Sequence, residues 1–166
     1  MPSFLFFTVI TYSLFLTSCS VSSLLNLKEA APVFSNEIIL PDLPVDFVIK
    51  KDTSFPSWKN TKTANMISVL SDCSNSDMNL KNAHAVITNA IDNEIVIEEK
   101  KVEFKNTSGF YRKVTGRIDG HYIEIQSTSF KFKKCFYVTS LSGLLEKTAS
   151  DLQLWQTFNQ NIEFKK

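Results

Sequence analysis

Residues 110–141 read FYRKVTGRIDGHYIEIQSTSFKFKKCFYVTSL, and this stretch decides the fold. Near its centre stands Asp119-Gly120, a strong hairpin signal, because a two-residue type I′ turn needs positive φ at both positions. Residues 121–132 and 135–141, which follow that turn, have the length and composition of two further strands. The stretch therefore predicts consecutive antiparallel strands, arranged as a meander.

Upstream of the meander, the sequence predicts two strands and a helix. The short apolar runs 47–49 and 66–70 are predicted to be the first pair of strands, with residues 54–60 as a loop or sheet edge between them. A helix follows, and Ser76 or Asp77 is suited to be its N-cap. Steps of three and four place these apolar residues on one helical face: Leu80, Ala83, Ile87 and Ala90.

The remaining elements complete an α+β pattern. Residues 95–104 are predicted to form a strand, and residues 106–109 a turn that leads into the meander. A last helix is predicted to begin at Ser150, which forms a capping-box pattern with Gln153. The order strands, helix, meander, helix predicts an α+β fold with helices packed on an antiparallel β-sheet. The last helix is expected to bury one stripe of side chains: Leu152, Trp155, Phe158 and Ile162.

Composition limits the classes of function. The chain has 166 residues, of which 43% are hydrophobic and 21% charged, as expected of one globular domain behind a short leader. Its 18 basic and 17 acidic residues leave a net charge of +1, so no large field would attract nucleic acid or an anionic bilayer. Four glycines in the whole chain exclude a glycine-rich phosphate-binding loop.

The N-terminus has the form of a secretory leader. Residues 4–16 carry no charge, and thirteen residues are too few for a bilayer-spanning helix, which needs about 20. The motif LTSC at 16–19 looks like the lipobox of bacterial lipoproteins, which predicts cleavage before Cys19 and a covalent lipid on its thiol. The first basic residue is Lys28, whereas such leaders normally open with Lys or Arg. The alternative is a short buried helix that ends in an ordinary cysteine.

The lipoprotein interpretation predicts three segments. Residues 1–18 are the signal peptide, residues 19–46 the lipidated N-terminus and a proline-interrupted tether, and residues 47–166 a single α+β domain. Because two or more acyl chains anchor a protein stably, a triacylated cysteine would hold it at the membrane. Ser20 and Val21 follow the cysteine, without the Asp that commonly retains such proteins at the inner membrane of enterobacteria. We therefore expect a cell-envelope protein in the outer membrane, facing the periplasm.

Cys73 and Cys135 remain after the lipidated cysteine is assigned. In an oxidising periplasm two leftover cysteines are usually bonded, and each is predicted to lie at a strand end, so we predict a Cys73–Cys135 disulfide. The alternative is a reactive or metal-binding thiol. The sequence has no Cys-x-x-Cys motif and only two histidines to complete a site, so no metal or other cofactor is predicted apart from the lipid.

Few residues suggest chemistry. His84 is interpreted as a packed or surface histidine, and a nucleophilic set of Asp119, His121 and Cys73 is disfavoured because Asp119 already suits a turn. No catalytic residue is predicted. The best candidate for a contact surface is the segment around Phe55 and Trp58, which stand in a Pro/Ser-rich stretch.

The ordered motifs resemble a known group. Segments 58–60 (WKN), 67–73 (ISVLSDC) and 134–137 (KCFY), together with the Asp119-Gly120 hairpin, resemble uncharacterised lipoproteins of deltaproteobacteria and their predatory relatives. Thr63-Ala64 stands where that pattern often has Thr-Gly. The end of the chain also looks like the wider PsbP/Mog1/DcrB-like group, which implies an α/β/α sandwich around an antiparallel sheet.

Two functions are expected from these features. The first is a non-enzymatic envelope lipoprotein that binds a protein partner through its sheet face or the Trp58 segment. The second is a carrier or accessory factor for lipid or another apolar ligand, which predicts a hydrophobic pocket between helix and sheet. An enzyme is the least favoured class, because it needs a polar cleft that gathers Asp119 or His121 with other ionisable groups.

Overall fold

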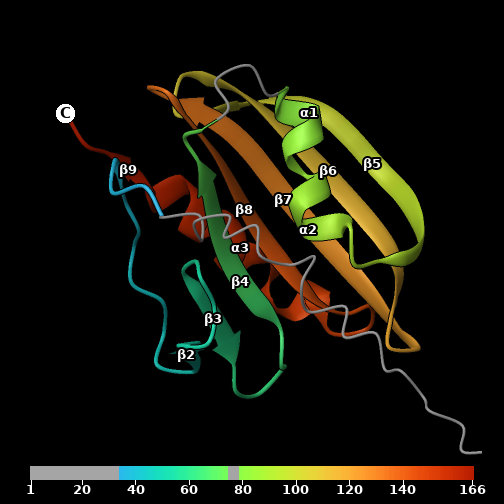
Figure 1. Ribbon diagram of the computed structural model, residues 1–166. Helices are drawn as coiled ribbons and strands as arrows, with labels where there is room; N and C mark the ends of the chain where they lie inside the picture. Colours follow the sequence, from blue (N-terminus) through green and yellow to red (C-terminus); the bar gives the residue numbers. More distant parts are fainter. Residues whose placement is uncertain (1–33, 75–78) are drawn as a thin grey trace, which may run out of the picture.

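The computed structural model describes residues 34–74 and 79–166, and its centre is a seven-stranded antiparallel sheet (Figure 1). The strand order is β2-β3-β4-β8-β7-β6-β5, so the last four strands form the predicted meander. The strands are β2 (Phe47–Ile49), β3 (Ser57–Asn60), β4 (Met66–Asp72), β5 (Asp92–Phe104), β6 (Thr107–Ile118), β7 (His121–Phe132) and β8 (Cys135–Leu144).

Helices cover both faces of this sheet. Two short helices, α1 (Leu80–Ala83) and α2 (Ala85–Thr88), lie across β6 and β7 on one face. A 3₁₀ turn (Thr148–Asp151) and α3 (Leu152–Asn161) lie on the opposite face, behind β4 and β8 in Figure 1. The predicted α+β architecture, an α/β/α sandwich, is therefore confirmed.

The main core lies between the sheet and α3. Because side chains alternate along a strand, every second residue of β4, β7 and β8 points to this side. Phe130 is at its centre, stacked on Phe104 with ring centroids 3.9 Å apart and on Tyr137 at 5.2 Å. Three residues of the predicted α3 stripe, Trp155, Phe158 and Ile162, are buried against it, and Leu152 is only partly buried.

The hairpin turns explain the register of the meander. Asp119 and Gly120 have φ values of 50° and 80°, as the predicted type I′ turn requires. The turn before β6 differs from the prediction: Lys105 and Asn106 have φ values of 51° and 62°, and residues 107–109 already belong to the strand. Asn tolerates this left-handed region because its short side chain can bond to nearby backbone, so the turn needs no glycine.

The sequence-based prediction missed β3. This segment was expected to be a loop or a sheet edge, but it is an internal strand between β2 and β4, which are therefore not paired with each other. The strand reads SWKN, and its two fully or nearly buried residues are polar. Ser57 bonds to Ser68 through their hydroxyls at 3.0 Å, and Asn60 donates to Asp151 at 2.9 Å. A strand is recognised in a sequence by apolar residues that alternate with polar ones. Because the buried residues of β3 are polar, its sequence lacks this alternation.

Both helices also depart from the predictions at their ends. The expected single helix from Leu80 is divided at His84, and Asn79 caps it by accepting a bond from the amide of Lys81 at 2.9 Å. The predicted caps Ser76 and Asp77 lie outside the described residues. The predicted capping box at Ser150 is absent, because the helix begins two residues later after a 3₁₀ turn.

The folded domain also begins earlier than predicted. Residues 34–46 were assigned to the tether, but Ile38 is 4% exposed and belongs to the main core. The segment β1 (Ile38–Ile39) pairs with β9 (Glu163–Phe164) in a separate two-stranded sheet. The apolar run Ile38-Ile39-Leu40 made this part of the predicted tether a candidate for the sheet edge, but the local sequence could not identify its partner, β9 at the C-terminus. The predicted signal peptide and the predicted lipidation residue Cys19 lie outside the described residues.

Candidate functional site

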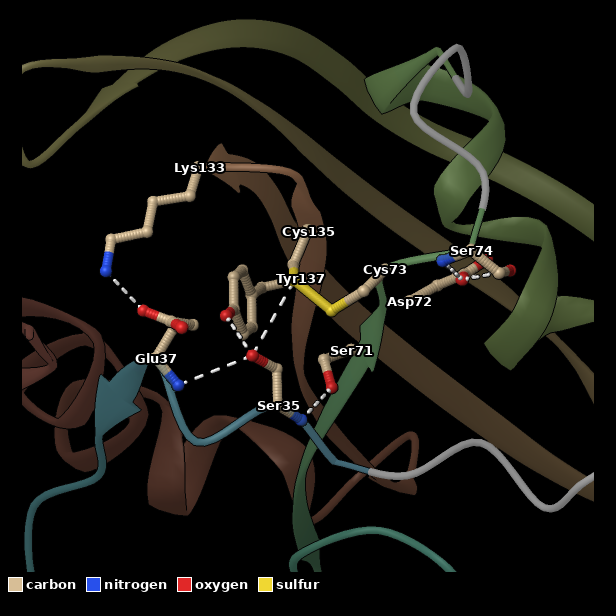
Figure 2. Close-up of a disulfide and its surroundings, with 9 residues drawn as sticks. All are labelled: Ser35, Glu37, Ser71, Asp72, Cys73, Ser74, Lys133, Cys135 and Tyr137. Carbon is tan, nitrogen blue, oxygen red and sulfur yellow. Dashed lines mark hydrogen bonds and ion pairs between the residues drawn. A yellow bond between two sulfur atoms is a disulfide. The ribbon is translucent and has the colours of Figure 1, made fainter.

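A disulfide closes one end of the sheet (Figure 2). Cys73 directly follows β4, and Cys135 is the first residue of β8, which pairs with β4. Their Cα atoms are 4.1 Å apart, and the structure contains the disulfide between them. The predicted cysteine pair is thus brought together by strand pairing at the sheet end.

The first described residues are bound to this disulfide end. The Ser35 amide donates to the Ser71 hydroxyl at 2.8 Å, and the Ser35 hydroxyl accepts from the Tyr137 hydroxyl at 2.9 Å (Figure 2). Lys133 forms an ion pair with Glu37. These contacts hold the last part of the predicted tether in one place, at one end of the groove described next.

An apolar groove lies between α2 and the sheet, on the face opposite α3. It has a volume of about 560 Å³ and is continued by a small apolar pocket of about 160 Å³ that shares three lining residues with it. We call both together the apolar groove. Its main apolar lining residues are Phe34, Phe55, Met66, Leu70, Val86, Ile87, Ile118, Ile123, Ile125 and Leu144.

The groove exists because the two short helices leave part of the sheet uncovered. Cross-strand register places Met66 beside Ser142 and Ser142 beside Ile125, which gives a floor with a small residue in its middle. Val86 of α2 forms part of the wall and is 59% exposed. Val86 and the apolar floor below it form an exposed apolar surface. Covering this surface with another apolar group is favourable, because it removes apolar area from water.

The structure separates the two predicted contact residues. Phe55 lines the apolar groove on the α1–α2 side. Trp58 points to the α3 side, where its half-buried ring packs edge-on against Phe158 with centroids 5.8 Å apart. Phe55 and Trp58 therefore do not form one surface, and a partner contact through Trp58 stays a prediction.

His84 is buried at the base of the α1–α2 layer. Its ring nitrogens contact the Ser127 hydroxyl at 2.7 Å and the Phe110 carbonyl oxygen at 3.1 Å. Because a carbonyl only accepts, the neutral ring donates from Nε2 to Phe110 and accepts from Ser127 at Nδ1. Burial, together with the smaller effect of the nearby Arg112 charge, lowers the pKa of His84 to about 4. The histidine is a neutral packed residue, so of the surface and packed positions that the sequence left open the structure has the packed one.

This histidine predicts a loss of stability in mild acid. Its pKa is about 4 in the folded state and about 6.5 in an unfolded chain, so below pH 6.5 the unfolded state binds the proton first. We expect the free energy of unfolding to fall by about 3 kcal/mol between pH 6.5 and pH 4, as measured by urea unfolding. In His84→Gln this part of the pH dependence should disappear. The matched control is His121→Gln at the exposed hairpin, which should keep it.

The residues considered for catalysis are not assembled into a site. Asp119 and His121 lie at the rim of the apolar groove, while Cys73 is bonded in the disulfide. Glu98 pairs with Lys100, whereas Glu99 pairs with Lys81 and Arg112 on the α1 side, so the two carboxylates do not act together.

Across residues 34–74 and 79–166 no group of His, Cys, Asp and Glu has metal-site geometry. Over the same ranges, no helix combines the length and apolar character needed to cross a membrane.

A second, polar groove lies beneath the edge of α3, over β5, β6 and β7. It has a volume of about 960 Å³. On its floor the Tyr111 hydroxyl donates to Gln126 at 2.9 Å, and the Gln126 amide donates to Glu124 at 2.7 Å. Lys113 completes this chain with an ion pair to Glu124 at 2.9 Å. The sequence analysis missed this groove, although residues 124–129 (EIQSTS) are polar at inward positions of a strand, which was an available signal.

No protein-family model matches the sequence, and no curated protein matches it. Solved structures do match the fold. LpqN of Mycobacterium tuberculosis, described as involved in cell envelope biogenesis, is similar with a TM-score of 0.57 and 10% identity over 78% of this chain and 83% of LpqN. The cyanobacterial PsbP protein of Synechocystis sp. PCC 6803 is similar with a TM-score of 0.52 and 10% identity, over 79% of this chain and 84% of that protein.

A protein of unknown function from Pseudomonas aeruginosa is also similar, with a TM-score of 0.50 and 10% identity over 77% of this chain and 83% of that one. Identities this low show the fold alone, because one fold supports many functions. They confirm the PsbP-like part of the resemblance, whereas the likeness to deltaproteobacterial lipoproteins stays a prediction. The chain has a PsbP-like fold: a seven-stranded antiparallel sheet with helices packed on both faces.

Proposed function

We propose that the protein is a non-enzymatic lipoprotein of the bacterial envelope whose domain binds a lipid acyl chain in the apolar groove. The observation that carries this proposal is the groove itself: a continuous apolar surface between α2 and the sheet, open to solvent. The groove supports the second function expected from the sequence, a carrier of an apolar ligand, which predicts a hydrophobic pocket between helix and sheet. The protein-partner hypothesis relied partly on Trp58, and that ring is half-buried against Phe158.

The groove suits an acyl chain in size and lining. Binding clefts for small molecules are commonly about 300–1,000 Å³, and the main part of this groove is about 560 Å³. Its walls are mostly aliphatic, and each methylene removed from water contributes about 0.8 kcal/mol. Asp119 and His121 stand at the rim, where a polar lipid headgroup would lie outside the apolar floor.

The position of Phe34 supports a ligand from the membrane. Phe34 lines the small pocket at one end of the groove, and Cys19 precedes it by 15 positions. Even fully extended, these residues span about 50 Å, so a lipid on Cys19 would keep the groove entrance close to the bilayer surface. The similarity to LpqN, a protein involved in cell envelope biogenesis, agrees with this location.

Titration of the purified protein with dansyl-undecanoic acid tests the groove. The dye should become more fluorescent as its chain enters the apolar groove. In Val86→Asp, the affinity should fall at least about tenfold, because a carboxylate would face the acyl chain. Val86 is 59% exposed, so this variant should still fold.

The matched control is Val48→Asp, because Val48 is 52% exposed and lies on β2, away from the groove. It should bind the dye as the unmodified protein does. Equal affinities in all three proteins, or an equal loss in both variants, would count against acyl-chain binding in the groove.

One observation favours protein binding as a second function. Ile95, Val96 and Ile97 are consecutive exposed apolar residues on β5, which forms an open edge of the sheet. Free strand edges can pair with a strand of another protein, and the exposed side chains would add apolar contact. Crosslinking in the native bacterium should then capture one abundant protein with the unmodified chain and lose it with Ile97→Lys.

A further inference from the structure

The polar groove under α3 is independent of the apolar groove, and we propose that it is a second binding site, for a neutral ligand rich in hydroxyl groups, of the oligosaccharide class. This inference goes beyond the proposed function, because the two grooves lie on opposite faces of the sheet. Its basis is a set of buried polar atoms with unused hydrogen-bonding capacity, together with a lining whose charges cancel.

Two residues of α3 line the groove and leave polar atoms unpaired. Trp155 is 2% exposed and Asn159 is 9% exposed, and both contribute to the groove wall. Within the described ranges, the indole Nε1 of Trp155 and the Oδ1 of Asn159 have no hydrogen-bond partner. Buried polar groups are nearly always paired, and these two atoms are enclosed within the groove wall. They offer one unused donor and one unused acceptor to a ligand once the α3 side chains shift toward it.

A third unpaired atom lies next to them in the sheet. The Oγ1 of the fully buried Thr139 has no partner among the described residues, and its cross-strand neighbour is Thr128, which lines the groove. The terminal torsion of an Asn side chain is broad, so a small rotation of Asn159 suffices to turn its amide into the groove. Ligand hydroxyls both donate and accept, and they match such a mixed set of atoms.

The rest of the lining is also suited to hydroxyl groups. The side-chain amides of Gln156 and Gln160 each offer a donor and an acceptor. The Tyr111 hydroxyl donates to Gln126, which leaves its oxygen free to accept from a ligand. Burial, with the charges of Glu98 and Glu124, raises the pKa of Tyr111 to about 12, so this hydroxyl stays neutral at physiological pH.

The charges around the groove argue against an ionic ligand. Lys113 is paired with Glu124 at 2.9 Å, and Lys100 is paired with Glu98 at 2.7 Å. The two remaining charged residues of the lining are one acid and one base, Glu103 and Lys105. The lining itself has three basic and two acidic residues, and the buried Glu124 that pairs with Lys113 brings the acidic groups to three. The groove with its ion-pair partners therefore has no excess charge to select a phosphate or a cation.

Nuclear magnetic resonance of the full protein tests this site, with chitotriose and maltotriose as neutral oligosaccharide probes. The indole N–H resonance of Trp155 should shift as sugar is added, because this unpaired donor gains an acceptor. The indole resonance of Trp58, which does not line the groove, is the internal reference. If neither sugar moves the Trp155 resonance while the protein stays folded, the proposal is overturned.

Variants of α3 locate the binding. Asn159→Ala should weaken binding of the sugar that shifts Trp155 at least about tenfold. Gln156→Ala, at an exposed position of the same wall, should also weaken sugar binding. It replaces Asn159→Ala as the test if that variant does not fold. Gln153→Ala, exposed on α3 but outside the groove lining, is the control and should bind normally. Unchanged affinity in both groove variants would contradict the proposal, as would an equal loss in the control.

Discussion

Removing the disulfide, by Cys73→Ala with Cys135→Ala, is expected to lower the free energy of unfolding by about 4 kcal/mol. The two cysteines are 62 positions apart, and the bond closes a long loop that includes α1, α2 and the strands β5, β6 and β7. In the chain-entropy model, a loop of this length strongly reduces the freedom of the unfolded chain.

Native contacts around the bond add to this effect. Cys135 contacts Ser35, and Ser35 also accepts from Tyr137, so loosening this end also releases the segment that carries Phe34 (Figure 2). Urea unfolding of the oxidised protein and of the double variant at the same pH measures the difference. A loss below about 1 kcal/mol would mean that strand pairing between β4 and β8 alone fixes this end of the sheet.

Gly143→Ala is expected to lower the free energy of unfolding by about 3 kcal/mol or more. An added Cβ at Gly143 would stand 1.9 Å from the Oδ1 of Asn65, which is fully buried. Asn65 would have to move, but its amide donates to Asp151 at 2.7 Å and to the Lys147 carbonyl at 2.8 Å.

The cost of this substitution comes from the buried carboxylate of Asp151, which also accepts from Asn60 and from Thr63. Moving Asn65 removes one of its donors, and leaving a buried charged group underbonded costs about 1–3 kcal/mol. The control is Gly120→Ala, where φ is +80° but no atom lies within 4 Å, so only the backbone conformation is strained, at about 1 kcal/mol. Equal losses in the two variants would show that Asn65 relaxes freely.

The meander and the disulfide were predictable because their signals are local. Asp119 and Gly120 both tolerate positive φ, which a type I′ turn requires, so this pair of residues alone indicates the turn type. Cys73 and Cys135 stand at the ends of two recognisable strands, so their proximity required only that those strands pair. Such patterns depend only on residues that are close in the sequence, so they can be recognised without knowing the fold.

The other elements depend on distant partners. Strand β3 is held by Ser57 and Asn60, whose partners are on β4 and before α3, and β1 needs the C-terminal strand β9. Asp151, which the capping box would have placed in the first helical turn, instead has its carboxylate occupied by three side chains from another part of the chain. A local sequence pattern cannot reveal these contacts, because the partners of each residue come from distant parts of the chain and meet it only in the folded protein.

The candidate sites were predictable only in part. Phe55 was identified from its exposed context, but the groove that it lines arises from cross-strand rows of β4, β8 and β7. The polar groove depends on which inward residues α3 leaves uncovered, which a helix prediction alone cannot give. Groove shape is a property of packing between elements, whereas composition and periodicity describe each element alone.

Photocrosslinking in native membranes tests acyl-chain binding most directly. Cells fed a palmitate analogue with a diazirine in its chain are irradiated, the protein is purified, and the labelled peptides are identified by mass spectrometry. Label from analogue that was bound non-covalently before irradiation should map to Phe55, Val86 and the β7–β8 residues of the apolar groove, and Val86→Asp should remove it. Label confined to the exposed β5 edge at residues 95–97, or its absence from groove peptides of a folded protein, would contradict acyl-chain binding in the groove.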